Sequence, residues 1–289
     1  MVKFSDFYYK IFENVQVINN KGGVPDKIVN KFMLLYKSFT NFVNAKDIKK
    51  RAKNGYDEKY AKLHKFKNLH KGKRCFIICT GPSLTLDDIN MLKGEYTFGL
   101  NSITKLFDKT DWRPSYYVIS DAAVYNSLRN DEAFKNIKRK FIANDIAKVE
   151  KTGDKDVVYY VDGYDCFKFG HAVKFSDNAY VKVFAGGTVT YDAMQLAAYM
   201  GFNEVYLLGC DSDYSGAQKH FSEYWSDNSK LKDLNFSVSQ LFESYKTAQK
   251  YCEIHELKIY NATRGGKLEV FPRVDFDSLF DEKDDKKNC

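Results

Sequence analysis

Residues 180–214, YVKVFAGGTVTYDAMQLAAYMGFNEVYLLGCDSDY, decide the fold, because they read as a strand, a glycine turn, a helix, a second strand and an acidic loop. The helical part has apolar residues at helical spacing and ends at Gly201, a residue type that often follows the last turn of a helix. The flanking segments, residues 180–184 and 205–208, are short and apolar, as buried strands are. The pattern predicts a βαβ unit with two parallel strands.

The loops that follow these two strands, residues 185–190 and 210–216, are expected to open on one edge of the sheet, where ligands bind in such folds. Working outward from this unit, the sequence alternates between strand and helix patterns. Further strands are expected at residues 74–79, 96–100, 116–120, 140–143, 157–161 and 258–260. The alternation predicts one Rossmann-like α/β domain with a mostly parallel sheet and helices on both faces.

The composition is that of a globular protein. The 289 residues are 44% hydrophobic and 29% charged, enough for one large core or one core with a smaller attached domain. The six cysteines form no CxxC pair and no metal-ligand spacing, which fits a reducing compartment. Since no apolar run approaches the ~18 residues of a membrane span and no signal-peptide pattern opens the chain, we expect a cytoplasmic protein.

The net charge of +7 is concentrated near the N-terminus, where residues 1–73 hold 17 Lys and Arg against 6 Asp and Glu. Within this part, residues 25–43 have the pattern of a basic amphipathic helix, which packs on its own domain or lies on an anionic membrane as a peripheral contact at the inner face. No nucleic-acid-binding motif is present, so nucleic acid is not an expected partner. We divide the chain into a basic helical extension at residues 1–70, a catalytic domain at 71–280 and a charged tail at 281–289.

Polar residues follow most of the predicted strands directly. The first strand runs into the turn Gly81-Pro82-Ser83, whose N–H groups suit a phosphate, although the sequence has neither a P-loop nor GxGxxG. Asn and Asp also favour turns and helix caps, so each residue alone has a structural explanation. Together they predict a binding crevice at the carboxyl edge of the sheet, and the residues concerned are Thr80, Asn101, Ser120, Asp121, Asn144, Asp162 and Asp211.

Several residues could carry chemistry at that edge. His220 lies in the polar segment 216–235 and could act as a general base, with His171 as the next candidate. Tyr214 and Arg264 can donate to phosphate oxygens. Asp211 and Asp213 form a DxD, which either holds Mg²⁺ or Mn²⁺ against a diphosphate or serves in capping and supporting roles.

With these residues placed, the chain resembles the bacterial hydroxymethylpterin diphosphokinase-like family, a domain of unknown function often encoded with surface-polysaccharide genes. The likeness runs from about residue 71 to 271, and it is carried by the order of five short motifs. They are KGKRCFIICTGPSL from Lys71, EYTFGLNSI from Glu95, TDWRPSYYVISD from Thr110, GFNEVYLLGCDSDYSG from Gly201 with KHF from Lys219, and IYNATRGGKLEVF from Ile259.

More distantly, the GPSL turn, Asn101, the helix start at residues 188–200 and GFNEVYLLGCD are similar to bacterial CMP-sialic-acid-dependent sialyltransferases. That family binds its CMP donor on a Rossmann-like domain without metal. The resemblance implies that its phosphate-binding tyrosine corresponds to Tyr214 and its catalytic histidine to His220. Thr80 stands where the family has Asn before GPS, so that side-chain amide contact is absent here.

Three hypotheses follow. The first is a cytoplasmic glycosyltransferase without a metal cofactor, moving a CMP-linked sugar to a saccharide or lipid-linked acceptor in surface-polysaccharide synthesis. In it His220 is the base, Tyr214 and Arg264 stabilise the leaving phosphate, and the nucleotide is held by Gly81, Pro82, Ser83, Asn101, Asp121, Gly187, Thr188, Thr190 and Asp211. The second is a diphosphokinase using Mg-ATP, with Asp211 and Asp213 as metal ligands. The third is a nucleotide-binding protein without turnover that docks at a membrane through residues 25–43.

Overall fold

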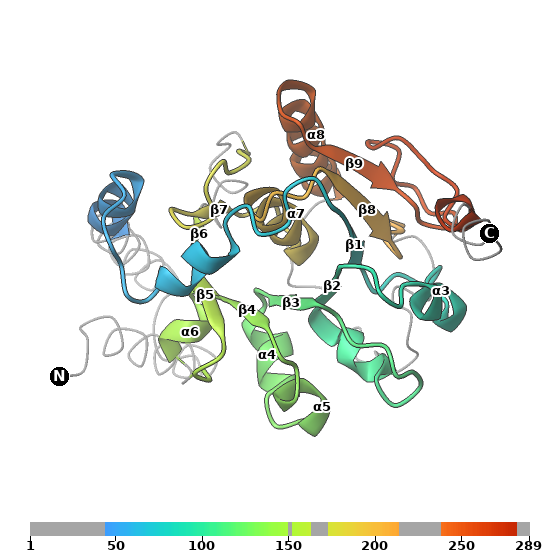
Figure 1. The fold of residues 1–289 in the computed structure, drawn as a ribbon, viewed down its shortest axis with the longest axis horizontal. Helices are drawn as coiled ribbons and strands as arrows, with labels where there is room; N and C mark the ends of the chain where they lie inside the picture. Colours follow the sequence, from blue (N-terminus) through green and yellow to red (C-terminus); the bar gives the residue numbers. More distant parts are fainter. Residues whose placement is uncertain (1–43, 150–151, 163–172, 214–237, 282–289) are drawn as a thin grey trace, which may run out of the picture.

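The computed structural model describes residues 44–149, 152–162, 173–213 and 238–281. Its centre is a sheet of seven strands in the order β5-β4-β3-β2-β1-β8-β9, with every neighbouring pair parallel. The predicted parallel α/β sheet is therefore confirmed (Figure 1). The strands are β1 Arg74–Ile78, β2 Thr97–Leu100, β3 Tyr116–Ile119, β4 Lys140–Ala143, β5 Val157–Tyr159, β8 Glu204–Leu208 and β9 Lys258–Asn261.

Helices cover both faces of this sheet, as the alternating pattern predicts (Figure 1). On one face lie α7 (Val189–Tyr199) and α8 (Val238–Ile254), which pack in one apolar core. The second core lies on the other face and takes side chains from six further helical segments. These are α3 Leu86–Met91, η2 Asn101–Leu106, α4 Ala122–Leu128, α5 Glu132–Lys135, α6 Ile146–Val149 and η4 Asp277–Leu279.

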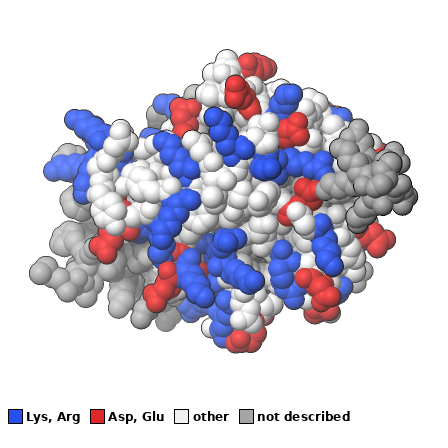
Figure 2. Space-filling model, in the orientation of Figure 1, with Lys and Arg blue, Asp and Glu red and all other residues white. Residues whose placement is uncertain are grey.

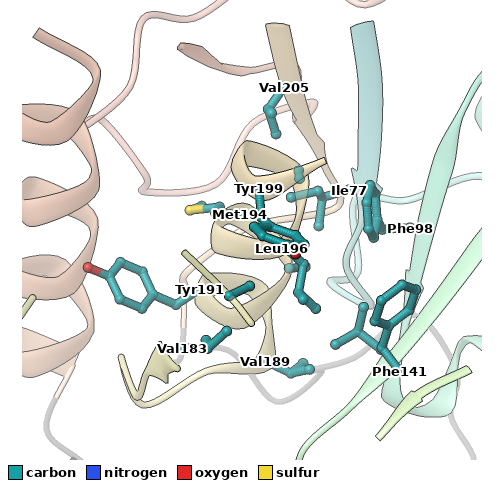
Figure 3. Packing of buried hydrophobic residues seen from close by; sticks show 14 of the residues in the cluster. Ile77, Phe98, Phe141, Val183, Val189, Tyr191, Met194, Leu196, Tyr199 and Val205 are labelled. Carbon is teal, nitrogen blue, oxygen red and sulfur yellow. The ribbon is translucent and has the colours of Figure 1, made fainter. Parts of the chain in front are cut away.

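The central strands are apolar on both sides because both of their faces are covered. Ile77 of β1 points into the core on the α7 side, while Phe76 and Ile78 point into the other core, and all three are fully buried. Figure 3 shows Leu196 of α7 on the side of the helix that faces Ile77 and Phe98. The alternation along β1 thus supplies two cores from one strand.

The predicted strand at residues 180–184 is wrong in extent and in partner. Only β7 (Val183–Phe184) is extended, and it pairs with β6 (Val161–Asp162) in a separate two-stranded sheet. The reason lies in a turn at Asn178, whose side-chain oxygen accepts from the Tyr180 N–H and whose carbonyl accepts from the Val181 N–H. The first strand of the predicted βαβ unit therefore lies outside the main sheet.

Residues 44–70, part of the predicted extension, share the core of the α/β domain. They contain a helix at residues 44–52 and η1 (Ala61–Phe66), and Leu63 is fully buried. The Arg51 guanidinium is buried between the Val181 carbonyl and Asp57. The predicted basic helix at residues 25–43 and the tail beyond residue 281 lie outside the described residues. Within the described part of the chain, no helix is long and apolar enough to cross a membrane.

Candidate functional site

A cavity of about 150 Å³ lies at the carboxyl ends of β1 and β8. From β1 the chain continues to β2 on one side, and from β8 it continues to β9 on the other side. The cavity therefore occupies the topological switch point, where open α/β sheets bind ligands. Its walls come from the loops after β1, β2 and β8, the start of α7 and one side chain of α8. The lining residues are Cys79, Thr80, Gly81, Leu100, Asn101, Thr188, Val189, Thr190, Gly209, Cys210, Asp211, Ser212, Asp213 and Tyr245.

The loops after β1 and β8 are bound to each other through Asp211. Its Oδ2 accepts from the Ser83 hydroxyl at 2.8 Å, and the Gly81 N–H donates to the Gly209 carbonyl at 2.8 Å. A Cβ at Gly81 would lie only 1.9 Å from Asp211 Oδ2, so this approach requires glycine. Burial raises the pKa of Asp211, and the hydrogen bonds from Ser83 oppose that rise.

The start of α7 forms a second wall. Thr188 is the N-cap, and its hydroxyl accepts from the Thr190 N–H at 3.3 Å. Gly187 precedes the cap with φ +75°, a conformation that favours glycine. Because Thr188, Val189 and Thr190 line the cavity, the positive end of an eleven-residue helix faces it, an arrangement that suits a phosphate.

Asn101 is held in a strained position on the third wall. Its φ is +43°, in the left-handed region that non-glycine residues seldom occupy, and its carbonyl accepts from the Tyr117 hydroxyl. The side-chain Oδ1 is buried and has no hydrogen-bond partner among the described residues. A buried acceptor without a partner is costly, so its position at the cavity suits a ligand that donates an N–H or O–H.

The lining residues that the sequence reasoning missed include Cys79, Cys210 and Tyr245. The two thiols hydrogen-bond to each other, and Cys210 Sγ lies 3.5 Å from the Tyr245 hydroxyl. The hydrogen bond to Cys210 and burial raise the pKa of the Cys79 thiol, so this thiol stays protonated at neutral pH. Cys79 directly follows β1 and Cys210 lies two residues past β8, which is the position that already identified their polar neighbours.

The two carboxylates of the DxD have different partners. Asp211 faces the Ser83 turn, while Asp213 forms an ion pair with Lys267 at 3.0 Å. Ser212 between them has φ +51°. Within the described residues, no group of three or more His, Cys, Asp or Glu side chains is placed to hold a metal ion. The metal-ligand role considered for Asp211 and Asp213 stays a prediction.

Other predicted site residues lie apart from the cavity lining. Asp121 caps α4 by accepting from the Ala123 and Val124 N–H groups. This is the helix-capping role that an Asp at such a position often has. Arg264 pairs with Asp88 at 2.9 Å and with Asp277 at 2.5 Å. Pro82 is exposed on the turn, and Ser83 reaches the site only through Asp211.

A buried carboxylic acid supports the α7 wall from behind. Asp192 of the first turn of α7 accepts from the Tyr159 hydroxyl of β5 at 2.9 Å. Burial raises the pKa of Asp192 to about 7, while the hydrogen bonds from Tyr159 and Ser120 lower it. The pair fixes the start of α7 against the sheet.

The sequence profile of one family, described as 6-hydroxymethylpterin diphosphokinase MptE-like, matches residues 46–217. The chain belongs to this family. The resemblance predicted from the five motifs is therefore confirmed, and the likeness to CMP-dependent sialyltransferases stays a prediction. Of the residues that line the cavity, only Tyr245 lies outside the part that the MptE-like profile matches.

Among curated proteins, none matches this MptE-like chain. A solved structure that does match is that of the MAf glycosyltransferase from Magnetospirillum magneticum AMB-1, with 16% sequence identity and a TM-score of 0.49. The match covers 78% of this chain and 40% of that chain, so the chain spans well under half of the length of its structural neighbour. Tyr214, His220 and His171 lie outside the described residues.

Proposed function

We propose that the protein is a glycosyltransferase that moves a sugar from a nucleotide donor, CMP-linked by preference, to a saccharide acceptor. One observation carries this proposal: a helix N-terminus, a glycine turn and an unpartnered amide oxygen meet in one cavity at the switch point of the sheet. The likeness of the motifs to CMP-dependent sialyltransferases supports the choice of nucleotide. We place the reaction in the cytoplasm.

In this proposal the donor phosphate lies at the start of α7, close to the Thr188 and Thr190 hydroxyls. The nucleoside lies toward Asn101, whose Oδ1 accepts a hydrogen bond from a base amine or a ribose hydroxyl. The hydrogen bond between Ser83 and Asp211 keeps the two loops together and satisfies a buried carboxylate. These contacts use only protein groups and need no metal ion.

The chemical step uses residues that follow Asp213 in the sequence. His220 removes the proton of the acceptor hydroxyl, and Tyr214 donates to the departing phosphate. Arg264, the third residue considered for this step, is left out of it, because Asp88 and Asp277 already hold its guanidinium.

A second function is favoured by the family match. A diphosphokinase would transfer a diphosphate from Mg-ATP to a heterocyclic alcohol such as hydroxymethylpterin, with the Mg²⁺ ion entering as part of the substrate. The N-terminus of α7 would serve the triphosphate equally well. The two functions differ in nucleotide and in their dependence on Mg²⁺.

A thermal-shift panel of CMP, UDP, GDP and ATP, each with and without Mg²⁺, tests the proposal. A ligand at ~100 Kd that binds only the folded state stabilises it by about 2.7 kcal/mol, a measurable shift. We expect CMP to raise the melting temperature equally with and without Mg²⁺. A shift with ATP that requires Mg²⁺ would establish the diphosphokinase instead. If no nucleotide shifts the melting temperature, both functions are wrong.

A further inference from the structure

The amino-terminal edge of the sheet, opposite the cavity, carries exposed basic side chains. We propose that this surface, called the basic face, docks on an anionic phospholipid bilayer. Figure 2 shows Lys and Arg side chains gathered over η1 and the segment leading into β1. The basic face consists of Lys65, Lys67, Lys71, Lys73, Lys93, Lys138 and Arg139.

The backbone fixes these residues at one edge. Residues 68–72 cross the C-terminal end of α7, where the His70 N–H donates to the Met200 carbonyl at 2.8 Å and the Gly72 N–H to the Gly201 carbonyl at 3.2 Å. Since α7 leads into the amino end of β8, this crossing lies at the amino edge of the sheet. Lys93 precedes β2, and Lys138 and Arg139 precede β4 at the same edge.

The lysines of this face take no part in ion pairs within the described residues. Their paired neighbours are different: Arg74 bonds Glu95 at 2.9 Å, and the buried Lys140 lies 3.4 Å from Asp156. The fold thus pairs the inner basic residues and leaves the outer lysines without ion-pair partners among the described residues. Exposed lysines of this kind can attract an anionic surface.

Two exposed apolar side chains lie within the same face. Leu69 is 53% exposed and Tyr96 is 38% exposed. The centroid of the Tyr96 ring lies 4.2 Å from that of the His70 ring and 5.6 Å from that of the Phe202 ring. Tyr96 therefore packs against two other aromatic side chains. Basic residues around an exposed aliphatic and an exposed tyrosine match the headgroup region of a bilayer, where lysines meet phosphates and apolar side chains insert. A nucleic-acid backbone offers no apolar environment that would bury the Leu69 side chain.

The docking would also set the orientation of the site. With the amino edge on the bilayer, the cavity at the carboxyl edge opens toward water. This orientation selects the water-soluble saccharide over the lipid-linked acceptor among the substrates considered above. The docking itself does not depend on the proposed reaction.

Vesicle co-sedimentation of the full chain tests the inference. One set of vesicles is phosphatidylcholine alone, and the other is an equimolar mixture of phosphatidylglycerol and phosphatidylcholine. We compare wild type with Lys67→Gln/Lys71→Gln on the basic face and with Lys246→Gln/Lys250→Gln on the exposed side of α8. Both doubles remove two charges and keep residues 1–43 unchanged.

We expect wild type to bind the anionic vesicles only. At ~1 kcal/mol for each lysine near the membrane surface, or about fivefold in affinity, the basic-face double should bind more than about tenfold more weakly, and the α8 double within about twofold of wild type. Leu69→Ser should weaken binding in the same assay. Equal losses in both doubles, no loss in the first, or binding to a DNA duplex but not to anionic vesicles would each overturn the inference.

Discussion

At the scale of single residues, the structure distinguishes polar side chains that have partners within the protein from one that has none among the described residues. Arg264 and Asp121 looked alike in the sequence, since each lies just past a strand, yet one is held by two carboxylates and the other caps α4. Asn101 differs from both, because its side-chain oxygen is buried without a partner in the described structure. No local pattern reveals the partners of Arg264, since Asp88 and Asp277 are distant in sequence, whereas the N–H groups that Asp121 accepts from are only two and three residues ahead.

Asn101→Gly should weaken nucleotide binding without harming the fold. Glycine accepts φ +43° more easily than asparagine, so we expect the free energy of unfolding to stay equal or to rise by up to about 1 kcal/mol. Loss of one ligand hydrogen bond should raise the nucleotide Kd about 3–10-fold. Calorimetric titration and chemical denaturation measure the two quantities. A variant that loses stability but binds the nucleotide normally would assign Asn101 to the fold alone.

Asp192→Asn should change how stability depends on pH. The folded-state pKa of about 7 exceeds the ordinary pKa of an aspartate, 3.8, so the folded protein holds the proton more tightly than the unfolded chain. This contribution is complete below about pH 4 and is lost as the pH rises through 7. The amide stays neutral, so the melting temperature of the variant minus that of wild type should increase between about pH 4 and pH 7 and level off above pH 7. A difference that is independent of pH would contradict the assignment.

His220→Ala should abolish transfer and leave nucleotide binding nearly intact. A general base acts on the acceptor and contributes ~10²–10⁴-fold to the rate. Initial rates of transfer and the Kd of the nucleotide are the two readouts. If the variant transfers at the wild-type rate, the base is a different residue, and His171 is the next to replace.

At the scale of elements, the sequence predicts most strands to within one or two residues and misjudges local turns. The apolar runs of β1, β3 and β4 are unambiguous because both faces of these strands are buried. Residues 180–184 are also rich in β-branched and aromatic residues, but the Asn178 side chain accepts a hydrogen bond from the Tyr180 N–H and forms a turn there. After β2 the chain forms the 3₁₀ segment η2, which starts at the strained Asn101.

The approach of the Gly81 turn to the loop after β8 gives a prediction at this scale. Gly81→Ala should lower the free energy of unfolding by more than about 2 kcal/mol, because its Cβ would meet Asp211 Oδ2 and the Gly209 carbonyl. Gly94→Ala is the matched control, since no atom lies within 4 Å of its added Cβ and only the φ of +88° opposes it. Denaturation of both variants measures the difference. Equal losses would show that the two loops separate easily.

At the scale of the whole molecule, the two edges of the sheet have opposite characters. The carboxyl edge holds the cavity, and the amino edge holds the basic face. The sequence predicts the cavity because polar residues follow strands, and its excess of lysine before β1 indicates a separate basic surface. The thiols and Tyr245 on the cavity wall escaped prediction because apolar residues at strand ends and on helix faces are ordinary core positions.

The central claim is that the switch-point cavity binds a nucleotide without metal. Calorimetric titration of the full chain with CMP in the presence of EDTA tests it most directly, with Asn101→Gly as the comparison. We predict a saturable isotherm with one site in wild type and a Kd about 3–10-fold higher in the variant. No saturable binding of CMP in EDTA, or equal affinity in the two proteins, would contradict the account.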